Sequence, residues 1–206
     1  MIRKIYYTVF VIFLFYGCSG FDSSQKHSTR SKNFSKDEVS LIFSGESNQS
    51  MRVLSIYNQS DSVILRTKCD DVIVDSDDKT LMHLVDRMYA TVTDSSNDGV
   101  GIAAPQIGIL KNIIWVQRYD KEGNPFEVYF NPKIKKYTKR KLNWLEGCLS
   151  IPGRRDTTTT RSYAVLLEYT DVQNTKQIEM VEGFTAIIFQ HEIDHINGIL
   201  YLDRLK

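Results

Sequence analysis

Two histidines four residues apart, His191 and His195, are the strongest chemical signal in this chain of 206 residues. On a helix, side chains at this spacing lie one turn apart on the same face, so both imidazoles can bind one metal ion. Glu192 follows the first histidine and can reach a metal-bound water as a general base. Two histidines leave a tetrahedral site short of a third protein ligand, and that ligand decides the class of enzyme.

The third ligand is expected upstream of the two histidines. Tyr201 stands where a metzincin protease carries its third histidine, and no other histidine follows it. His83 is one upstream candidate. Cys148 is the better one, because the neighbouring Gly147 lets the backbone approach a ligand closely. A thiolate is a strong ligand for zinc or ferrous iron, so the sequence favours a site of one cysteine and two histidines.

Three blocks of sequence that contain these residues resemble the signature of the peptide deformylase family. A single HExxH segment recurs by chance, whereas three blocks at the spacing of one family are a specific signal. The resemblance covers the chain from about Met51 to the C-terminus. The blocks are Gly99-Val100-Gly101-Ile102-Ala103-Ala104-Pro105-Gln106, Glu146-Gly147-Cys148-Leu149-Ser150 and Gln190-His191-Glu192-Ile193-Asp194-His195.

The resemblance implies a metal-dependent hydrolase that removes the formyl group from N-formylmethionine at the start of new bacterial polypeptides. It assigns one divalent metal to Cys148, His191 and His195. It favours Fe²⁺, while Zn²⁺, Ni²⁺ and Co²⁺ also suit these ligands. Glu192 is the implied general base, which takes a proton from water and returns it to the departing amine.

The resemblance also implies how a formyl peptide is bound. The side-chain amide of Gln106 and the backbone N–H of Leu149 would stabilise negative charge on the formyl oxygen. Main-chain groups of Val100, Gly101 and Gly147 would pair with the peptide as an added strand. Apolar residues would line the methionine pocket or lie just behind it, namely Val100, Trp144, Phe184, Ile187 and Ile188.

Some residues near the blocks have roles that the sequence leaves open. Relatives carry an arginine that touches the substrate backbone after the second block. Here Arg154 and Arg155 both occupy that region, and the segment after them is one residue longer than usual. Glu146 is expected close behind the cysteine of its block, where it would fix the loop. Asp194 is expected to hold a partner such as Arg161.

The first fifty residues have the composition of an export signal followed by a linker. Arg3 and Lys4 precede an apolar run over residues 5–16, which is shorter than the ~20 residues of a bilayer span and suits a signal peptide. Gly17-Cys18 then resembles the site at which bacterial lipoproteins are cleaved and lipidated. We predict a signal peptide over residues 1–17, a flexible Ser-rich tether over 18–50 and a catalytic domain over 51–206.

These assignments predict a bacterial lipoprotein that is anchored to the membrane through lipidated Cys18 and faces away from the cytoplasm. Formylated nascent chains, however, emerge inside the cytoplasm. One alternative is therefore a cytoplasmic product that starts at Met51. A second is an exported metallo-amidase or metallopeptidase with another peptide substrate, and a third is a protein that only binds metal or formyl peptides. Glu192 and Gln106 favour an enzyme over the third alternative.

Charge and cysteine content limit the partners. The net charge is +1 with 25% charged residues, so no large basic field indicates a nucleic-acid partner. The expected partners are an N-formylated peptide or nascent chain and the membrane, and we expect a monomer. Cys69 is left unpaired once Cys18 and Cys148 are assigned, and a Cys69–Cys148 disulfide is the alternative.

Apolar periodicity locates the elements that must hold the site. A helix is predicted over residues 79–93, and a second one over 183–197 carries both histidines. Strands rich in β-branched and aromatic residues are predicted over 111–116, 126–130 and 163–169, with a turn at Gly123-Asn124-Pro125. The prediction is an α+β fold, with short antiparallel strands around a central metal-binding helix. The resemblance implies the same, peptide-deformylase-like fold.

Overall fold

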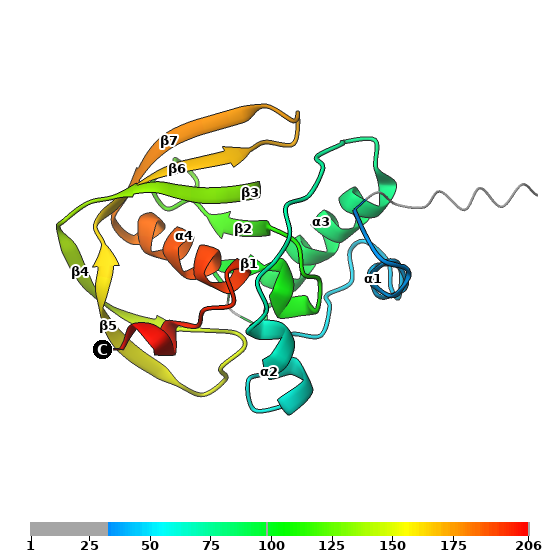
Figure 1. Cartoon of the computed structure of the whole chain (residues 1–206), viewed down its shortest axis with the longest axis horizontal. Coiled ribbons are helices and arrows are strands. Elements are labelled where there is room, and N and C mark those ends of the chain that lie inside the picture. The colour runs from blue at the N-terminus through cyan, green and yellow to red at the C-terminus, as the bar shows by residue number, and fades with distance from the viewer. Residues whose placement is uncertain (1–32, 98, 206) are drawn as a thin grey trace, which may run out of the picture. The chain divides into compact units, whose positions relative to one another are not determined.

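The computed structural model describes residues 33–97 and 99–205, in which helices and antiparallel strands are mixed (Figure 1). The residues of the predicted signal peptide lie outside this part of the chain. The elements are α1 (Lys36–Ile42), α2 (Gln59–Leu65), α3 (Lys79–Val92), β1 (Gly101–Ala103), a 3₁₀ turn (Ala104–Ile107), β2 (Ile113–Gln117), β3 (Phe126–Tyr137), β4 (Lys141–Gly147), β5 (Arg155–Ser162), β6 (Ala164–Thr170), β7 (Lys176–Glu182), α4 (Gly183–Ile196) and a second 3₁₀ turn (Tyr201–Arg204).

Two antiparallel sheets surround helix α4. The larger sheet has the strand order β1-β2-β3-β6-β7, and β4 pairs with β5 in a separate two-stranded sheet. Helix α4 contacts strands of both sheets and lies between them in Figure 1. This arrangement confirms the predicted α+β fold of short antiparallel strands around a central helix.

Helix α4 is buried on most sides because its sequence is apolar over more than one face. Ala186, Ile187, Ile188, Phe189 and Ile193 are all buried. A helix that is apolar nearly all round is stable only where structure covers it on each side, as the two sheets do here. The predicted range of 183–197 is confirmed to within one residue.

Two further predictions are confirmed in detail. Helix α3 begins after Asp78, whose side chain accepts hydrogen bonds from the backbone N–H groups of Thr80 and Leu81. The predicted turn connects β2 and β3, with Gly123 and Asn124 at positive φ angles of 76° and 49°. Strands β1, β4, β5 and β7 and helix α2 were absent from the prediction.

The predicted flexible tether over residues 18–50 is wrong for residues 33–50, which are folded. Helix α1 begins at a capping box on Ser35, and Phe34 and Ile42 are 7% and 0% exposed. Both side chains belong to the hydrophobic core that α3 lines. The few apolar residues of this polar segment therefore suffice, because they add to a core that already exists. The remainder of the predicted tether lies outside the described residues.

A buried arginine fastens this N-terminal segment to α3. Arg87 is 4% exposed, and its guanidinium donates to the carbonyl oxygens of Leu41, Ile42 and Gln49 at 3.0–3.2 Å and to Ser44 Oγ at 3.1 Å. These acceptors are all uncharged. The described contacts thus stabilise the cation through dipoles, while burial opposes the charge and lowers the pKa of Arg87.

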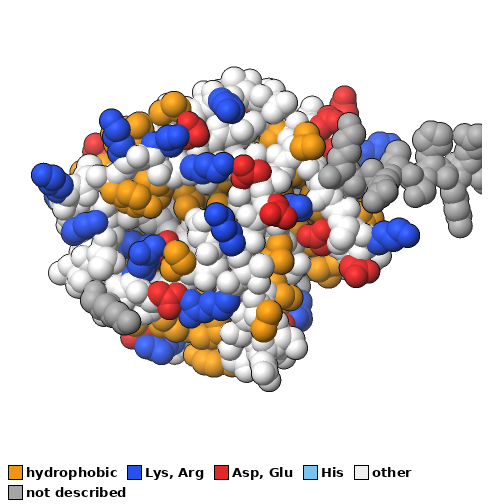
Figure 2. Space-filling view, viewed as in Figure 1, with side chains coloured by type: hydrophobic (Ala, Val, Ile, Leu, Met, Phe, Trp, Pro, Cys, Tyr) orange, Lys and Arg blue, Asp and Glu red, His pale blue; other side chains and the backbone are white. Residues whose placement is uncertain are grey.

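The charged side chains are mixed in sign on the surface, as the small net charge predicts. On the face shown in Figure 2, Lys and Arg side chains are interspersed with Asp and Glu.

The described cysteines form no disulfide. Within the described ranges, Cys69 and Cys148 are free, so the alternative of a disulfide between them is wrong. Over the same ranges, every helix is too short or too polar to cross a bilayer.

Candidate metal centre

The residue after β4 and the C-terminal half of α4 bring a thiol and two imidazoles together. One ligand atom from each of Cys148, His191 and His195 lies within 4.8 Å of the others, and the Cys148 sulfur is 3.2 Å from His195 Nε2. One soft thiolate and two imidazoles suit Zn²⁺ or Fe²⁺ and leave a coordination position open. The three predicted ligands therefore form a group that fits one divalent metal. His83 lies outside it, on α3, with Nε2 2.9 Å from the carbonyl oxygen of Gly45.

Glu146 orients the first histidine. Its Oε2 is 2.8 Å from His191 Nδ1, which leaves the other ring nitrogen to a metal. Arg161 donates to both oxygens of Glu146, at 2.8 and 2.9 Å, and Thr158 donates to Oε1. Burial opposes ionisation, but the hydrogen bonds from His191 and Arg161 lower the pKa of Glu146 to about 2. The sequence placed Glu146 behind the cysteine to fix its loop, whereas its contacts hold the histidine.

Asp194 extends this network to the C-terminal turn. Arg161 donates to Asp194 Oδ2 at 2.6 Å, which confirms the predicted pair, and Arg204 donates to both carboxylate oxygens at 2.6 and 3.1 Å. Arg161 is only 3% exposed and carries its charge between two carboxylates. The chain of contacts from Arg204 to Glu146 therefore links the last turn to the back of His191.

Glu192 lies inside the site without a partner. It is 4% exposed, and its Oε2 accepts no hydrogen bond from the described residues. Burial raises the pKa of Glu192 to about 7, which suits a group that takes and returns a proton near neutral pH. Gly101 of β1 makes room for it, because a Cβ atom there would lie 2.6 Å from Glu192 Oε1. Any larger residue would displace the carboxylate.

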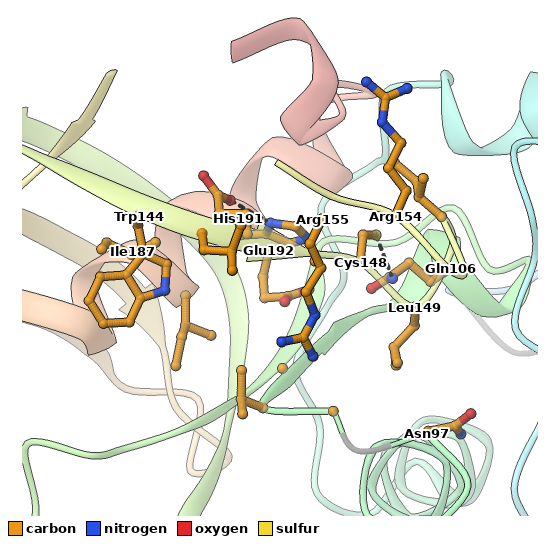
Figure 3. A pocket seen from close by; sticks show the side chains of 18 of the residues that line it. Asn97, Gln106, Trp144, Cys148, Leu149, Arg154, Arg155, Ile187, His191 and Glu192 are labelled. Carbon is orange, nitrogen blue, oxygen red and sulfur yellow. Dashed lines mark hydrogen bonds and ion pairs between the residues drawn. The ribbon is translucent and has the colours of Figure 1, made fainter. Parts of the chain in front are cut away.

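Gln106 is held with its amide donor facing the sulfur. Its Oε1 accepts a hydrogen bond from the Ala103 N–H at 2.8 Å, so its Nε2 points to Ser150 Oγ at 3.3 Å and to the Cys148 sulfur at 3.7 Å. Leu149 borders the same space (Figure 3). Gln106 and Leu149, the two residues predicted to donate to a formyl oxygen, thus both line the cavity that contains the thiol.

A cavity of about 1150 Å³ opens onto these groups. All four predicted substrate-binding residues line it, namely Val100, Gly101, Gly147 and Ile187. The apolar residues expected near the methionine side chain also lie in its wall, namely Trp144, Phe184 and Ile188. The structure therefore gathers the three sequence blocks around one space.

The two arginines after the second block point in different directions. Arg155 packs against Gly147 and reaches into the cavity in Figure 3, whereas Arg154 points out of it. Arg154 donates to Asp156 at 2.7 Å, and the same carboxylate oxygen is 3.1 Å from the hydroxyl of Tyr201. Both residues border the cavity, and Arg155 is the one whose guanidinium points into it.

Three residues of the site were missed. Ser150 lies against the Gln106 amide, and its place in the second block could have indicated a role. Thr158 binds Glu146 from a run of four threonines that gives no signal for one member. Tyr119 lines the cavity from the segment after β2, where the sequence pattern ends.

Comparisons with known proteins agree with this geometry. The sequence model of the family described as Polypeptide deformylase matches residues 53–206. The peptide deformylase of Leptospira biflexa is 36% identical over 151 residues, which cover 69% of this chain and 83% of the relative. That of Desulforudis audaxviator is 40% identical over 162 residues, which cover 75% and 94%.

Solved structures give the same result for the fold. The Met-Ala-Ser-bound class I type b peptide deformylase from Acinetobacter baumannii matches with a TM-score of 0.68 and 33% sequence identity, over 76% of this chain and 99% of that one. Its actinonin-bound form matches with a TM-score of 0.66. With the thiol, the two imidazoles and the buried glutamate in place, this chain belongs to the peptide deformylase family of metal-dependent hydrolases.

Proposed function

We propose that this protein removes the formyl group from N-formylmethionyl peptides with one divalent metal held by Cys148, His191 and His195. The observation that carries the proposal is the unpartnered, buried carboxylate of Glu192 in the same cavity as the thiol and the two imidazoles. A buried carboxylate that accepts no hydrogen bond can act as a general base and take a proton. The amide nitrogen of Gln106, which faces the thiol on the same cavity, supports hydrolysis of an amide.

Each side chain has a separate task in this reaction. A bound metal would polarise the formyl oxygen and lower the pKa of a bound water. Glu192 takes the proton of the attacking water and returns it to the departing amine. Gln106 Nε2 and the Leu149 N–H donate to the formyl oxygen as it gains negative charge, and one such donor typically lowers the barrier by ~3 kcal/mol.

We propose Fe²⁺ as the native metal. Thiolate and imidazole ligands suit Fe²⁺ and Zn²⁺ alike, so the preference rests on the family, and Ni²⁺ and Co²⁺ fit the same donors. Elemental analysis of protein purified without oxygen identifies the ion. Cys148→Ser should lose it, while Cys69→Ser, which changes the other described thiol, should keep a full complement.

We propose that the peptide lies along β1, with main-chain groups of Val100, Gly101 and Gly147 paired to it and Arg155 beside its backbone. The Acinetobacter baumannii enzyme, which shares the fold, was solved with Met-Ala-Ser bound. The positions of the four residues on one cavity support this path. A strand added to β1 would gain main-chain hydrogen bonds whatever the side chains of the peptide.

We propose that the enzyme acts outside the cytoplasm as a membrane lipoprotein anchored through Cys18. Arg3, Lys4, the apolar run over residues 5–16 and Gly17-Cys18 support this location. One acyl chain gives only marginal membrane binding, so stable anchoring would require more than one chain on the cysteine. The mass of the mature N-terminus from native membranes is the test. Soluble protein that begins at Met51 would exclude this location.

The activity is tested with the full-length, metal-loaded chain on formyl-Met-Ala-Ser and on its acetylated analogue. We expect formate from the first substrate and no cleavage of the second. Glu192→Ala should keep the metal and lose roughly 10²–10⁴-fold in turnover. Cleavage of the acetyl compound or of a peptide bond would instead identify a broader amidase or a peptidase.

A further inference from the structure

We propose that the side of strands β6 and β7 that points away from α4 docks on an anionic lipid bilayer. We call this surface the docking face and define it by Leu166, Ile178, Met180, Lys136 and Lys176. The inference goes beyond the proposed reaction and rests on the proposed location at a membrane. It adds the orientation in which the catalytic domain meets that membrane.

The strand register places these side chains on one side of the larger sheet. Met180 pairs with Leu166, which in turn pairs with Lys136 of β3. Ile178 and Lys176 precede Met180 at alternate positions of β7, so they point the same way. Buried residues at the intervening positions pack with those of α4, namely Val165, Leu167 and Val181. The sheet therefore separates the docking face from the helix that carries the two histidines.

The same side of the sheet is covered over β2 and open over β7. Helix α3 covers β2, where the Trp115 indole N–H donates to the carbonyl oxygen of Val85 at 3.0 Å. Two register shifts then follow in β3, and such bulges bend a strand. On β7, Ile178 and Met180 are 63% and 54% exposed. Two large apolar side chains that share one face thus lack cover from the described part of the chain.

Cations surround these apolar side chains. Lys136 and Lys176 form no ion pair with a described residue. Of the acids on this side, Glu168 is 3.4 Å from Lys135, and Glu182 lies at the far end of β7. Figure 2 shows Lys and Arg side chains over β3, β6 and β7. Apolar side chains among free lysines suit an anionic bilayer, which takes the first at its acyl boundary and the second at its headgroups.

A bilayer fits the docking face better than a second copy of the chain does. Two exposed apolar side chains fall well short of the ~800 Å² that each partner of a stable complex buries. A two-fold contact through this face would also bring the same lysines together. A bilayer requires no such area, because the proposed anchor already holds the domain nearby. At most roughly 50 Å of chain joins Cys18 to Asn33, the first described residue.

The orientation is tested with the lipidated protein in vesicles of phosphatidylglycerol and phosphatidylcholine whose acyl chains carry bromine, which quenches nearby tryptophan. Ile178→Trp puts a reporter in the docking face. Val63→Trp is the matched control, because Val63 is 65% exposed on α2, far from β7 in Figure 1. We expect quenching of the reporter at position 178 and none of the reporter at position 63. Trp115 and Trp144 give both variants the same background.

The charges are tested in the Ile178→Trp background. Lys136→Gln together with Lys176→Gln should lower the ratio of docked to undocked molecules by roughly fivefold for each lysine, as expected near an anionic surface. Lys36→Gln together with Lys79→Gln removes the same charge from α1 and α3 and should leave the ratio unchanged. Vesicles of phosphatidylcholine alone should reduce quenching as the first pair does. Hydrolysis of a formyl peptide in solution should not change in any of these variants.

Equal quenching of the two reporters, or quenching that ignores the docking-face lysines, overturns the proposal. An acidic protein partner would protect position 178 from acrylamide in native membranes but not in pure lipid, and this result overturns it as well. The mature N-terminus tests the anchor separately. Acylated Cys18 with equal quenching refutes the docking face alone. Soluble protein that begins at Met51, yet is quenched at position 178 by added vesicles, refutes the proposed location alone.

Discussion

Two buried arginines, Arg161 and Arg87, hold different regions of this fold by different means. Arg161 is 3% exposed and lies between the carboxylates of Glu146 and Asp194, behind the metal-binding helix. Arg87 is 4% exposed and is surrounded by uncharged oxygens of the N-terminal segment. Burial opposes both charges. The carboxylates nevertheless raise the pKa of Arg161, whereas burial lowers the pKa of Arg87.

The different acceptors around Arg161 and Arg87 indicate different structural roles for the two arginines. The carboxylates around Arg161 also fix a ligand histidine and the last turn of the chain, so this ion-pair network controls geometry at the site. The carbonyl groups around Arg87 belong to a segment with little apolar surface of its own. One cation there binds backbone oxygens at the end of α1 and at Gln49, and thereby holds α1 against α3.

Removal of residues 1–50 should lower the free energy of unfolding more than any other change considered. A chain that begins at Met51 loses the burial of Phe34 and Ile42, which stabilises the fold by about 1.5–3 kcal/mol each. It also lacks the backbone oxygens that accept hydrogen bonds from Arg87. The expected loss of about 3–6 kcal/mol is a large share of the 5–15 kcal/mol of a typical domain. Urea unfolding of the truncated and full-length chains measures it.

The matched control is a chain that begins at Ser31, which keeps every contact described for the segment. It should unfold at the midpoint of the full-length chain. Equal stability of the Met51 chain would show that the packing of α1 contributes nothing. It would also favour the cytoplasmic alternative, a product that starts at Met51.

Arg161→Met should cause the next largest loss of unfolding free energy. The substitution leaves two buried carboxylates without their shared cation, a change that typically costs about 3–5 kcal/mol. Because Glu146 then no longer holds His191 in one orientation, metal affinity should also fall, by roughly 10–100-fold. Denaturant unfolding and competition with a chelator report the two effects separately. Glu146→Gln is the gentler companion, since it keeps an acceptor for the histidine while removing one charge.

Arg87→Met should cost less, about 1–3 kcal/mol, because it leaves only neutral carbonyl oxygens without donors. Metal affinity should stay at the native value, since the segment that Arg87 holds does not contact the three ligands. A loss equal to that of Arg161→Met would contradict the distinction between charged and neutral acceptors. Loss of metal would contradict the separation of the two regions.

The site around Arg161 could be predicted from the sequence because most of its residues lie in blocks of fixed spacing. The HExxH segment places two ligands by helix geometry alone, and the apolar residues of α4 identify the helix. The different directions of Arg154 and Arg155 could not be predicted, since Arg154 binds Asp156, which also contacts Tyr201, 45 residues further along the chain. Strand β7 was missed because Ile178 and Met180 face solvent, against the usual pattern.

The region around Arg87 was mispredicted for a related reason. Serine and other polar or charged residues dominate residues 33–50, and composition alone indicates a linker. The segment folds through contacts with α3 between residues 45 and 46 positions apart in the sequence, which no local pattern reveals. One local signal was present: Ser35, three residues before Glu38, forms a capping box at the start of α1. The polar composition of the segment obscured this signal.

Ser35→Ala should give the smallest effect and shows whether that local signal matters. The Ser35 side chain accepts from the Glu38 N–H at 3.2 Å, and Glu38 in turn accepts from the Ser35 N–H at 2.8 Å. Loss of a serine cap typically costs about 1 kcal/mol, less than the loss of Arg87 because tertiary contacts still hold α1 in place. The control is Ser40→Ala, where the hydroxyl only donates back to the Lys36 carbonyl oxygen, and its unfolding midpoint should stay native or rise slightly. If Ser35→Ala were as destabilising as the Met51 truncation, the segment would depend on its own helix start more than on α3, and the role given to Arg87 would be wrong.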